Sequence, residues 1–316
     1  MKVLFIDSTQ PILKERLENA GFICDYLPNL PKEEIIERIK NYEGIIIRSR
    51  IKLNKDILSK ANRLKFIGRV GAGMENIDLE YAESKGIKCY NSPEGNRDAV
   101  GEHSLGMLLA LFNRLCIANN EVKTGSWNRE GNRGFEIKGK TIGIIGYGNM
   151  GSAFAQRLKG FEVKVIAYDK YKSDFGNENV TEVQLKNIFI ESDVLSLHVP
   201  LTMETEFMIN FDFIDKFKKP IYIINTARGK VVKTSDLVEQ IIKGKVLGAA
   251  LDVLEYEKTS FENIHQSNKN KDFQFLTESN QVILSPHIAG WTHESNIKLA
   301  TFLTDKIITD FGKQID

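Results

Sequence analysis

The chain has 316 residues, of which 42% are hydrophobic, so it is long enough for two domains that each bury a core. Its 43 lysines and arginines almost balance 42 acidic residues, and the formal net charge of +1 gives no indication of a nucleic-acid or membrane partner. No apolar run approaches the ~20 residues of a membrane span, and the short one at the N-terminus is predicted to be a strand rather than a signal peptide. Cys24, Cys89 and Cys116 are far apart and form no CxxC pair, so we expect reduced thiols, no metal site and a cytoplasmic location.

Short apolar runs alternate with amphipathic stretches in the first part of the chain. The predicted strands are Val3–Asp7, Phe22–Leu27, Gly44–Ile47, Phe66–Val70 and Lys88–Asn91. The predicted helices between them are Pro11–Ala20, Pro31–Lys40, Asn54–Ala61 and Asn76–Lys85. Because strands and helices alternate with short turns, this part is predicted to be α/β, with helices wrapping a parallel sheet through right-handed crossovers.

A long helix is predicted next, over Asp98–Thr124. Its apolar side chains cover a broad face that can bridge two domains or pack on a second subunit, and the pattern does not distinguish these alternatives. A second alternating series follows. Its predicted strands are Thr141–Ile145, Glu162–Tyr168, Val194–Leu197, Tyr222–Asn225, Leu247–Asp252 and Val282–Leu284. Six strands with helices between them make a complete dinucleotide-binding sheet.

Two segments complete the predicted order of elements. Glu255–Asn280 is polar and long for a loop without regular structure, so it is predicted to contain a short helix or a flap. Thr292–Phe311 is predicted to be the last helix.

A glycine pattern, Gly146-x-Gly148-x-x-Gly151, directly follows the predicted strand Thr141–Ile145. Gly146 permits a tight turn, Gly148 lets the backbone approach a pyrophosphate, and Gly151 lets the following helix pack closely on the strand. The N-terminus of that helix offers N–H groups and a positive dipole end to an anion. This pattern therefore predicts a dinucleotide-binding turn; the alternative is a plain glycine-rich turn.

Asp169 ends the next predicted strand, 18 residues after Gly151. A carboxylate at this place can accept hydrogen bonds from an adenosine ribose and would repel a 2′-phosphate, which favours NAD over NADP. Lys170 and Lys172 lie close by and weaken that preference. The alternative is a surface aspartate without a ligand.

Three polar residues, Arg228, Glu257 and His287, follow predicted strands in the second half of the chain. Ligands of an open parallel sheet bind outside the carboxyl ends of its strands, so these side chains can meet in one cleft. Arginine binds a carboxylate bidentately, histidine gives and takes a proton near neutral pH, and a nearby carboxylate stabilises an imidazolium. The set suits carbonyl reduction by a nicotinamide; the alternatives are a surface arginine, an ordinary loop acid and a turn histidine. The remaining histidines are weaker catalytic candidates: His103, His198, His265 and His293.

Six sequence runs occur in the order found in one known family. They are residues 70–78, 139–151, 198–202, 225–229, 248–253 and 285–290. With these runs the chain resembles the D-isomer-specific 2-hydroxyacid dehydrogenases and, among them, the phosphoglycerate dehydrogenases. The resemblance implies two doubly wound parallel-sheet domains: a Rossmann NAD-binding domain at residues 94–286, inserted into a flavodoxin-like substrate-binding domain formed by residues 1–93 and 287–316. It also implies a homodimer, in a short form without a C-terminal regulatory domain.

The resemblance implies roles for individual residues as well. Arg228, Glu257 and His287 take the catalytic roles, with His287 handling the proton, Glu257 tuning it and Arg228 holding a 2-oxo acid. The cofactor is NAD, and the residues implied to bind it are Gly146, Gly148, Asn149, Met150, Gly151, Asp169, Val199, Pro200, Thr205, Thr226, Ala227, Asp252 and Gly290. The run Val70, Gly71, Ala72 and Gly73 resembles the loop whose N–H groups bind the substrate carboxylate.

Arginines near the substrate loop bear on the choice of substrate. Arg48 and Arg50 follow a predicted strand and Arg69 precedes the loop; similar arginines bind the distal phosphate in phosphoglycerate dehydrogenases. The resemblance thus favours 3-phosphoglycerate and 3-phosphohydroxypyruvate, and a place in serine biosynthesis. If these are ordinary surface arginines, the alternative is a glyoxylate or hydroxypyruvate reductase. An alternative of another class is a non-catalytic NAD-sensing scaffold resembling a corepressor, against which the retained arginine, glutamate and histidine argue.

Overall fold

The computed structural model describes residues 1–257 and 270–312, which belong to two compact units. Of these residues, the first unit contains 1–96 and 291–312, and the second contains 97–257 and 270–290. The predicted domains, 1–93 with 287–316 and 94–286, stay a prediction. No helix within the described ranges combines the length and the hydrophobicity needed to cross a membrane.

The first unit is built on a five-stranded sheet in the order β2-β1-β3-β4-β5, and each strand pair is parallel. Its strands are β1 (Lys2–Phe5), β2 (Ile23–Tyr26), β3 (Gly44–Ile47), β4 (Phe66–Arg69) and β5 (Lys88–Tyr90). This is the flavodoxin-like order, whose chain direction across the sheet reverses between β1 and β3. The predicted flavodoxin-like sheet is therefore confirmed, and its ligand-binding edge lies at the carboxyl ends of β1 and β3.

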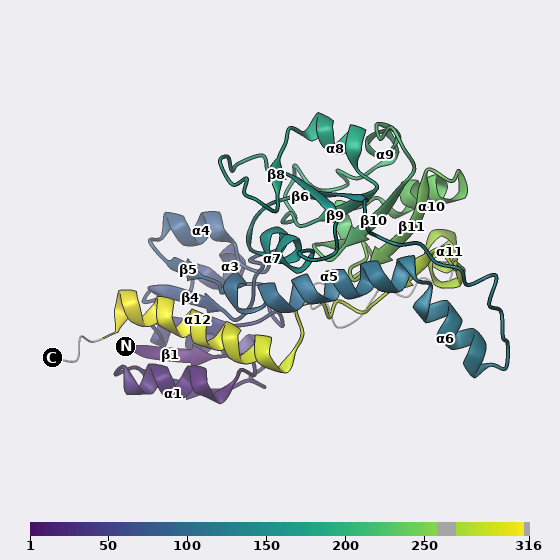
Figure 1. Ribbon diagram of the computed structural model, residues 1–316. Helices are drawn as coiled ribbons and strands as arrows, with labels where there is room; N and C mark the ends of the chain where they lie inside the picture. Colours follow the sequence, from purple (N-terminus) through teal and green to yellow (C-terminus); the bar gives the residue numbers. More distant parts are fainter. Residues whose placement is uncertain (258–269, 313–316) are drawn as a thin grey trace. The chain divides into compact units, whose positions relative to one another are not determined.

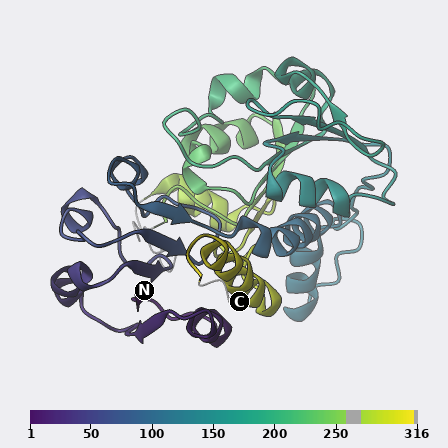
Figure 2. The same ribbon diagram turned by 90° about the vertical axis from the view of Figure 1, so that its left-hand side faces the viewer.

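Helices cover both faces of this sheet (Figures 1 and 2). They are α1 (Pro11–Asn19), α2 (Lys32–Arg38), α3 (Lys55–Leu58), α4 (Leu79–Ser84) and α12 (His293–Phe311), with the short 3-10 turns η1 (Ile39–Asn41) and η2 (Pro93–Gly95). Side chains alternate along a strand, so Val3 and Phe5 pack with α1 and α12, whereas Leu4 and Ile6 pack with α2, α3 and α4. Burial on both faces explains why these strands read as continuous apolar runs in the sequence.

The second unit is built on a seven-stranded parallel sheet in the order β12-β11-β10-β9-β6-β7-β8. Its strands are β6 (Thr141–Ile145), β7 (Lys164–Tyr168), β8 (Thr181–Glu182), β9 (Val194–Leu197), β10 (Ile221–Asn225), β11 (Val246–Leu251) and β12 (Val282–Leu284). This order contains the Rossmann arrangement, with its switch point between β6 and β9. The sequence predicted six strands and missed β8, which has two exposed residues and no apolar pattern.

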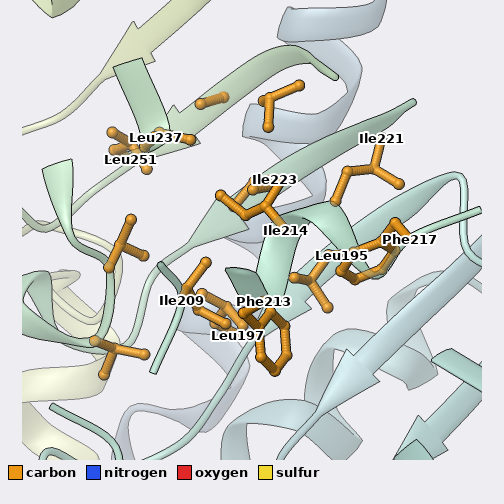
Figure 3. Packing of buried hydrophobic residues seen from close by; sticks show 14 of the residues in the cluster. Leu195, Leu197, Ile209, Phe213, Ile214, Phe217, Ile221, Ile223, Leu237 and Leu251 are labelled. Atoms are coloured by element: carbon orange, nitrogen blue, oxygen red, sulfur yellow. The ribbon is translucent and has the colours of Figure 1, made fainter. Parts of the chain in front are cut away.

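Helices also enclose the second sheet. They are α5 (Arg97–Phe112), α6 (Leu115–Lys123), α7 (Asn149–Arg157), α8 (Leu185–Glu191), α9 (Phe211–Asp215), α10 (Thr234–Ile242) and α11 (Lys271–Glu278), with the 3-10 turn η3 (Gly229–Val231). One core joins α8, α9, α10 and α11 to the sheet, and Figure 3 shows part of it, around Phe213 and Phe217. A second core joins α5 and α7 to the other face. The two cores hold the strands in place, so that their carboxyl ends form one fixed edge.

The predicted single helix over Asp98–Thr124 is wrong. The structure has two helices, α5 and α6, separated at Arg114, whose φ of 53° is left-handed and cannot continue an α-helix. No residue of α6 is buried, and Figure 1 shows α6 projecting from the end of α5, away from the sheet of its own unit.

The polar segment Glu255–Asn280 contains the short helix that the sequence predicted, α11. Asn270 caps this helix, because its side-chain oxygen accepts hydrogen bonds from the N–H groups of Asp272 and Phe273. The alternative for this segment, a flap, stays a prediction, and His265 lies within residues 258–269, outside the described residues.

Candidate active site

The glycine pattern forms the turn between β6 and α7, and two of its glycines are required by packing. Gly146 has a φ of +91°, and a Cβ there would lie 2.6 Å from the carbonyl oxygen of His198. A Cβ on Gly151 would lie 2.0 Å from the carbonyl oxygen of Gly146. A Cβ on Gly148, by contrast, would meet nothing within 4 Å. The protein itself leaves open space at Gly148, where a pyrophosphate would approach the N-terminus of α7, so this turn fits the dinucleotide that its sequence predicts.

Asp169 ties the turn after β7 to the glycine turn. Its carboxylate accepts hydrogen bonds from the N–H groups of Tyr147 at 2.7 Å, Tyr171 at 2.9 Å and Lys172 at 3.1 Å. The carboxylate is thus held next to the glycine turn, at the place predicted for ribose recognition.

The lysines beside Asp169 are also placed by the structure. Lys170 forms an ion pair with Glu204, which also accepts a hydrogen bond from the Tyr171 hydroxyl at 2.5 Å. Lys172 Nζ lies 3.4 Å from the carbonyl oxygen of Tyr147. Glu204 offsets the charge of Lys170. The two lysines therefore weaken the predicted preference for NAD over NADP less than two uncompensated lysines would.

Five further predicted cofactor residues follow β9 and β10: Val199, Pro200, Thr205, Thr226 and Ala227. Val199 lies close to the glycine turn, because a Cβ on Gly146 would be 3.0 Å from Val199 Cγ1. The Thr205 hydroxyl donates to the carbonyl oxygen of Pro200 at 2.6 Å and holds that loop. The buried Thr226 hydroxyl lies 3.0 Å from Ser104 of α5. These groups therefore gather along the sheet edge at the switch point; their contacts with NAD stay a prediction.

His287 and Glu257 form a close pair. His287 Nδ1 lies 2.6 Å from Glu257 Oε2, and Glu257 Oε1 accepts a hydrogen bond from the Leu254 N–H at 2.5 Å. Both side chains are largely buried, at 23% and 13% exposure. A carboxylate only accepts hydrogen bonds, so His287 donates through Nδ1, which leaves Nε2 as the atom that can exchange a proton with a ligand.

Arg228 lies on the loop after β10, which packs directly on the loop that carries Glu257. A Cβ on Gly229 would lie 2.0 Å from the carbonyl carbon and oxygen of Leu254, so only glycine permits this approach. Asn225 fixes the loop from within: its side chain donates to the Arg228 carbonyl oxygen at 3.0 Å and accepts from the Ala227 N–H at 3.0 Å. The structure thus brings the loops of Arg228 and Glu257 together, as the strand ends predicted.

Asp252 holds the turn on which His287 stands. His287 has a φ of +57°, a left-handed conformation that costs a non-glycine residue roughly 1–2 kcal/mol. The Asp252 carbonyl oxygen accepts from the His287 N–H at 2.8 Å, and its carboxylate accepts from the N–H groups of Ile288 at 2.9 Å and Ala289 at 2.8 Å. Asp252 is 1% exposed. Its carboxylate fastens this turn, a role that the sequence did not indicate; its predicted contact with nicotinamide stays a prediction.

Two further residues that the sequence missed reach the same carboxylate. The Ser285 hydroxyl lies 2.5 Å from Asp252 Oδ1, and His103 Nε2 lies 3.0 Å from the Ser285 hydroxyl. Sequence reasoning ranked His103 among the weaker candidates, because a histidine within a helix 182 residues from its partner leaves no local pattern.

In the first unit, the predicted carboxylate-binding loop Val70–Gly73 follows β4. Gly71 has a φ of +154°, and a Cβ there would lie 1.5 Å from Arg69 Nη1, so the guanidinium lies over this loop. The loop is anchored through its carbonyl groups: the Ser92 N–H donates to Gly71 at 3.0 Å, and the Asn91 side chain donates to Ala72 at 2.6 Å.

The predicted phosphate-binding arginines follow β3, at the switch point of the first sheet, but their guanidinium groups differ. Arg50 donates to the buried carboxylate of Asp7 at 3.0 Å, to the Leu30 carbonyl oxygen at 3.0 Å and to the Ile6 carbonyl oxygen. The Arg48 guanidinium stacks on Trp291, with its Cζ 4.5 Å from the ring centroid. The structure directs Arg50 toward the protein, whereas Arg48 rests on an aromatic face that is 54% exposed.

Comparison with known proteins decides the family. A family model described as "D-isomer specific 2-hydroxyacid dehydrogenase, NAD binding domain" matches residues 105–289, more than half of the chain. The chain belongs to this family. The expected cofactor of this 2-hydroxyacid dehydrogenase family member, NAD, is confirmed by the same match, and so is the predicted α/β fold class with its Rossmann domain.

Relatives of this family member carry two different names. The chain is 36% identical to a hydroxypyruvate reductase from Thermotoga maritima, over 97% of this chain and 95% of that protein. It is 34% identical to a D-3-phosphoglycerate dehydrogenase from Archaeoglobus fulgidus, over 98% of this chain but only 57% of that protein. The chain thus spans little more than half the length of this second relative.

A solved structure agrees with the family. The D-lactate dehydrogenase from Aquifex aeolicus, solved with NAD and lactic acid, has a TM-score of 0.82 and 34% identity, and the match covers 98% of this chain and 95% of that one.

Proposed function

We propose that this chain is an NAD-dependent oxidoreductase that interconverts a D-2-hydroxy acid and its 2-oxo acid. The observation that carries the proposal is the 2.6 Å contact between His287 Nδ1 and Glu257 Oε2, on a loop that packs against the loop of Arg228. A carboxylate-bound histidine at the carboxyl edge of a Rossmann sheet is suited to proton transfer next to a bound dinucleotide.

Each side chain has a role that follows from its chemistry. NAD, held by the glycine turn and Asp169, supplies the two-electron redox chemistry at substrate C2 when it is bound. His287 Nε2 gives a proton to the C2 oxygen during reduction and takes it back during oxidation. The Glu257 carboxylate keeps the imidazole oriented and accepts a hydrogen bond from the proton-bearing Nδ1, so that Nε2 faces the ligand. The Arg228 guanidinium binds the substrate carboxylate and polarises the C2 carbonyl.

The test of this proposal is a panel of 2-oxo acids assayed with NADH through the absorbance of the reduced nicotinamide. We expect turnover with at least one 2-oxo acid and formation of the D-isomer of the product. NADH binding without turnover on any member of the panel would contradict the proposal and support the non-catalytic scaffold instead.

For the substrate, we propose 3-phosphohydroxypyruvate and 3-phosphoglycerate. Arg48 and Arg69 support this, because they flank the predicted carboxylate-binding loop and a phosphate favours a cationic cluster. With this substrate, the protein would act in serine biosynthesis in the cytoplasm. We expect 3-phosphohydroxypyruvate to exceed hydroxypyruvate in kcat/KM by more than tenfold.

A second candidate substrate, hydroxypyruvate or glyoxylate, is favoured by the contacts of Arg50. Its guanidinium is already bound by Asp7 and two carbonyl groups, so it is poorly placed to bind a phosphate. The hydroxypyruvate reductase relative also matches along nearly its whole length.

A matched pair of variants separates the two substrates. For the phosphorylated substrate, Arg48→Gln should lose a charge-assisted contact and lower kcat/KM roughly tenfold or more, with little change for hydroxypyruvate. Arg50→Gln should lower stability rather than selectivity, because it leaves Asp7 buried without its cation. Equal losses on both substrates in Arg48→Gln would favour the unphosphorylated substrate.

We also propose that the chain forms a homodimer through α6 and the segment after it. This region exposes large apolar side chains: Leu115 is 55% exposed, Val122 52%, Trp127 83% and Phe135 61%. A helix that has no buried residue in the described part of the chain is unusual unless a partner covers it. Sedimentation should give the mass of two chains, and charged substitutions at Leu115 and Val122 should give one. A wild-type monomer would contradict the proposal.

A further inference from the structure

A partly buried chain of polar groups connects α5 to the turn that carries His287. It runs from His103 Nε2 to the Ser285 hydroxyl at 3.0 Å, and from that hydroxyl to Asp252 Oδ1 at 2.5 Å. Asp252 then accepts the N–H groups of Ile288 and Ala289. The chain of contacts therefore leads from a helix on one face of the sheet to the backbone directly after His287.

The number of protons in this chain fixes the direction of each hydrogen bond. The Ser285 hydroxyl has a single proton, and the carboxylate of Asp252 can only accept, so that proton points to Asp252. The Ser285 oxygen must then accept from His103, whose Nε2 carries the proton. The thioether of Met107, 3.9 Å from the same hydroxyl, is a much weaker acceptor that this arrangement leaves unused.

We propose that His103 is a positioning residue, which holds Ser285 and Asp252 in the arrangement that fixes the His287 turn. His103 Nε2 also lies 3.6 Å from Asp252 Oδ1, so it faces the carboxylate directly as well as through Ser285. Without this donor, Ser285 loses its hydrogen bond to α5, so its hydroxyl and the Asp252 carboxylate are held less firmly. The left-handed backbone at His287 depends on the hydrogen bonds that Asp252 accepts from this turn, because a non-glycine residue does not keep such a conformation without support.

This inference rests on the proposed function of His287, but its first readout does not. Hydrogen exchange of the Ile288 and Ala289 amides reports directly on the bonds to Asp252. His103→Leu, which removes the donor, should speed the exchange of both amides roughly tenfold or more. His103→Gln, which restores an N–H donor, should bring exchange back to within about threefold of wild type.

Activity is the second readout. A displaced His287 should lower kcat roughly tenfold to a hundredfold in His103→Leu, while the KM and the NADH dissociation constant stay within about threefold. His103→Gln should recover most of this loss. Because His103 and Ser285 act in one chain, Ser285→Ala should resemble His103→Leu, and the double variant should be no worse than the more impaired single one.

His293 provides the matched control, since it is an exposed histidine at the start of α12. His293→Leu should change neither exchange nor kcat. Wild-type amide exchange in His103→Leu, additive losses in the double variant, or a failure of His103→Gln to restore exchange would each overturn the inference. If the wild type turns over no 2-oxo acid, the proposed function fails, but the exchange experiment still decides the role of His103.

Discussion

The side chains of His287 and Arg48 are held in different ways, although a buried carboxylate fastens the backbone at both places. The Arg48 N–H donates to Asp7 Oδ2 at 2.5 Å, and Asp7 is 5% exposed. Asp252, 1% exposed, binds the backbone of the His287 turn through three hydrogen bonds, and Glu257 binds the imidazole itself. The Arg48 guanidinium rests instead on the half-exposed ring of Trp291. The imidazole proposed for proton transfer thus has a carboxylate within hydrogen-bond distance, whereas the guanidinium proposed to choose the substrate has an aromatic ring among its contacts. This contrast predicts a steep penalty for changes in the first region and a shallow one in the second.

The substitution Asp252→Asn is the most severe test of this contrast between the two regions. An amide nitrogen cannot accept, so one of the Ile288 and Ala289 N–H groups loses its partner and faces another donor. We expect a loss of kcat of roughly a hundredfold and a destabilisation of about 1–3 kcal/mol. Steady-state kinetics and chemical denaturation measure the two effects. A variant with wild-type kcat would show that the turn does not depend on this carboxylate.

The second prediction concerns acid stability and His198, at the end of β9. Burial lowers the pKa of this imidazole from 6.5 to about 3; its Nε2 contacts the Ser196 hydroxyl at 2.8 Å, and its Nδ1 has no hydrogen-bond partner among the described residues. Below about pH 6.5 the unfolded chain binds a proton that the folded one does not, so the free energy of unfolding falls with decreasing pH, by up to about 1.4 kcal/mol per pH unit.

His198→Asn tests this effect, because the variant lacks the titrating group. The stability difference between wild type and variant should shrink as the pH falls from about 7 to about 5. Denaturation curves at several pH values measure the difference, and parallel pH dependences for the two proteins would show that His198 is not kept neutral by the fold.

The smallest expected effect is that of Trp291→Phe. A phenyl ring binds a guanidinium less well than an indole, and such contacts contribute about 0.5–1 kcal/mol at exposed sites. We expect a two- to fivefold rise, at most, in the KM for 3-phosphohydroxypyruvate, with kcat and the KM for hydroxypyruvate unchanged. A change in kcat of the size expected for Asp252→Asn would erase the contrast between the two regions.

The sequence predicted those structural features that leave a pattern in neighbouring residues. β3, whose four residues are all buried, was predicted with its observed bounds, because burial on both faces produces a continuous apolar run. The glycine turn was found for a similar reason, since Gly146 and Gly151 each satisfy a steric demand of their neighbours. The break at Arg114 was missed, because a left-handed arginine between two helical stretches has no signature in composition or periodicity.

Contacts between distant residues explain the remaining omissions. His103 meets Ser285 across 182 residues, and Trp291 meets Arg48 only when two loops come together. A predicted site residue can also have a role that the sequence does not indicate. Asp252 is predicted to contact the cofactor, yet its carboxylate also binds the backbone of the His287 turn. Such roles depend on which donors the fold brings to a side chain, and they become visible only in three dimensions.

The central claim is that His287 transfers the proton at substrate C2. The most direct measurement is the turnover of His287→Ala beside its affinity for NADH, with the preferred 2-oxo acid of the wild type. The account predicts that kcat falls by roughly 10²–10⁴ while the NADH dissociation constant stays within about threefold. Turnover at the wild-type rate would contradict it.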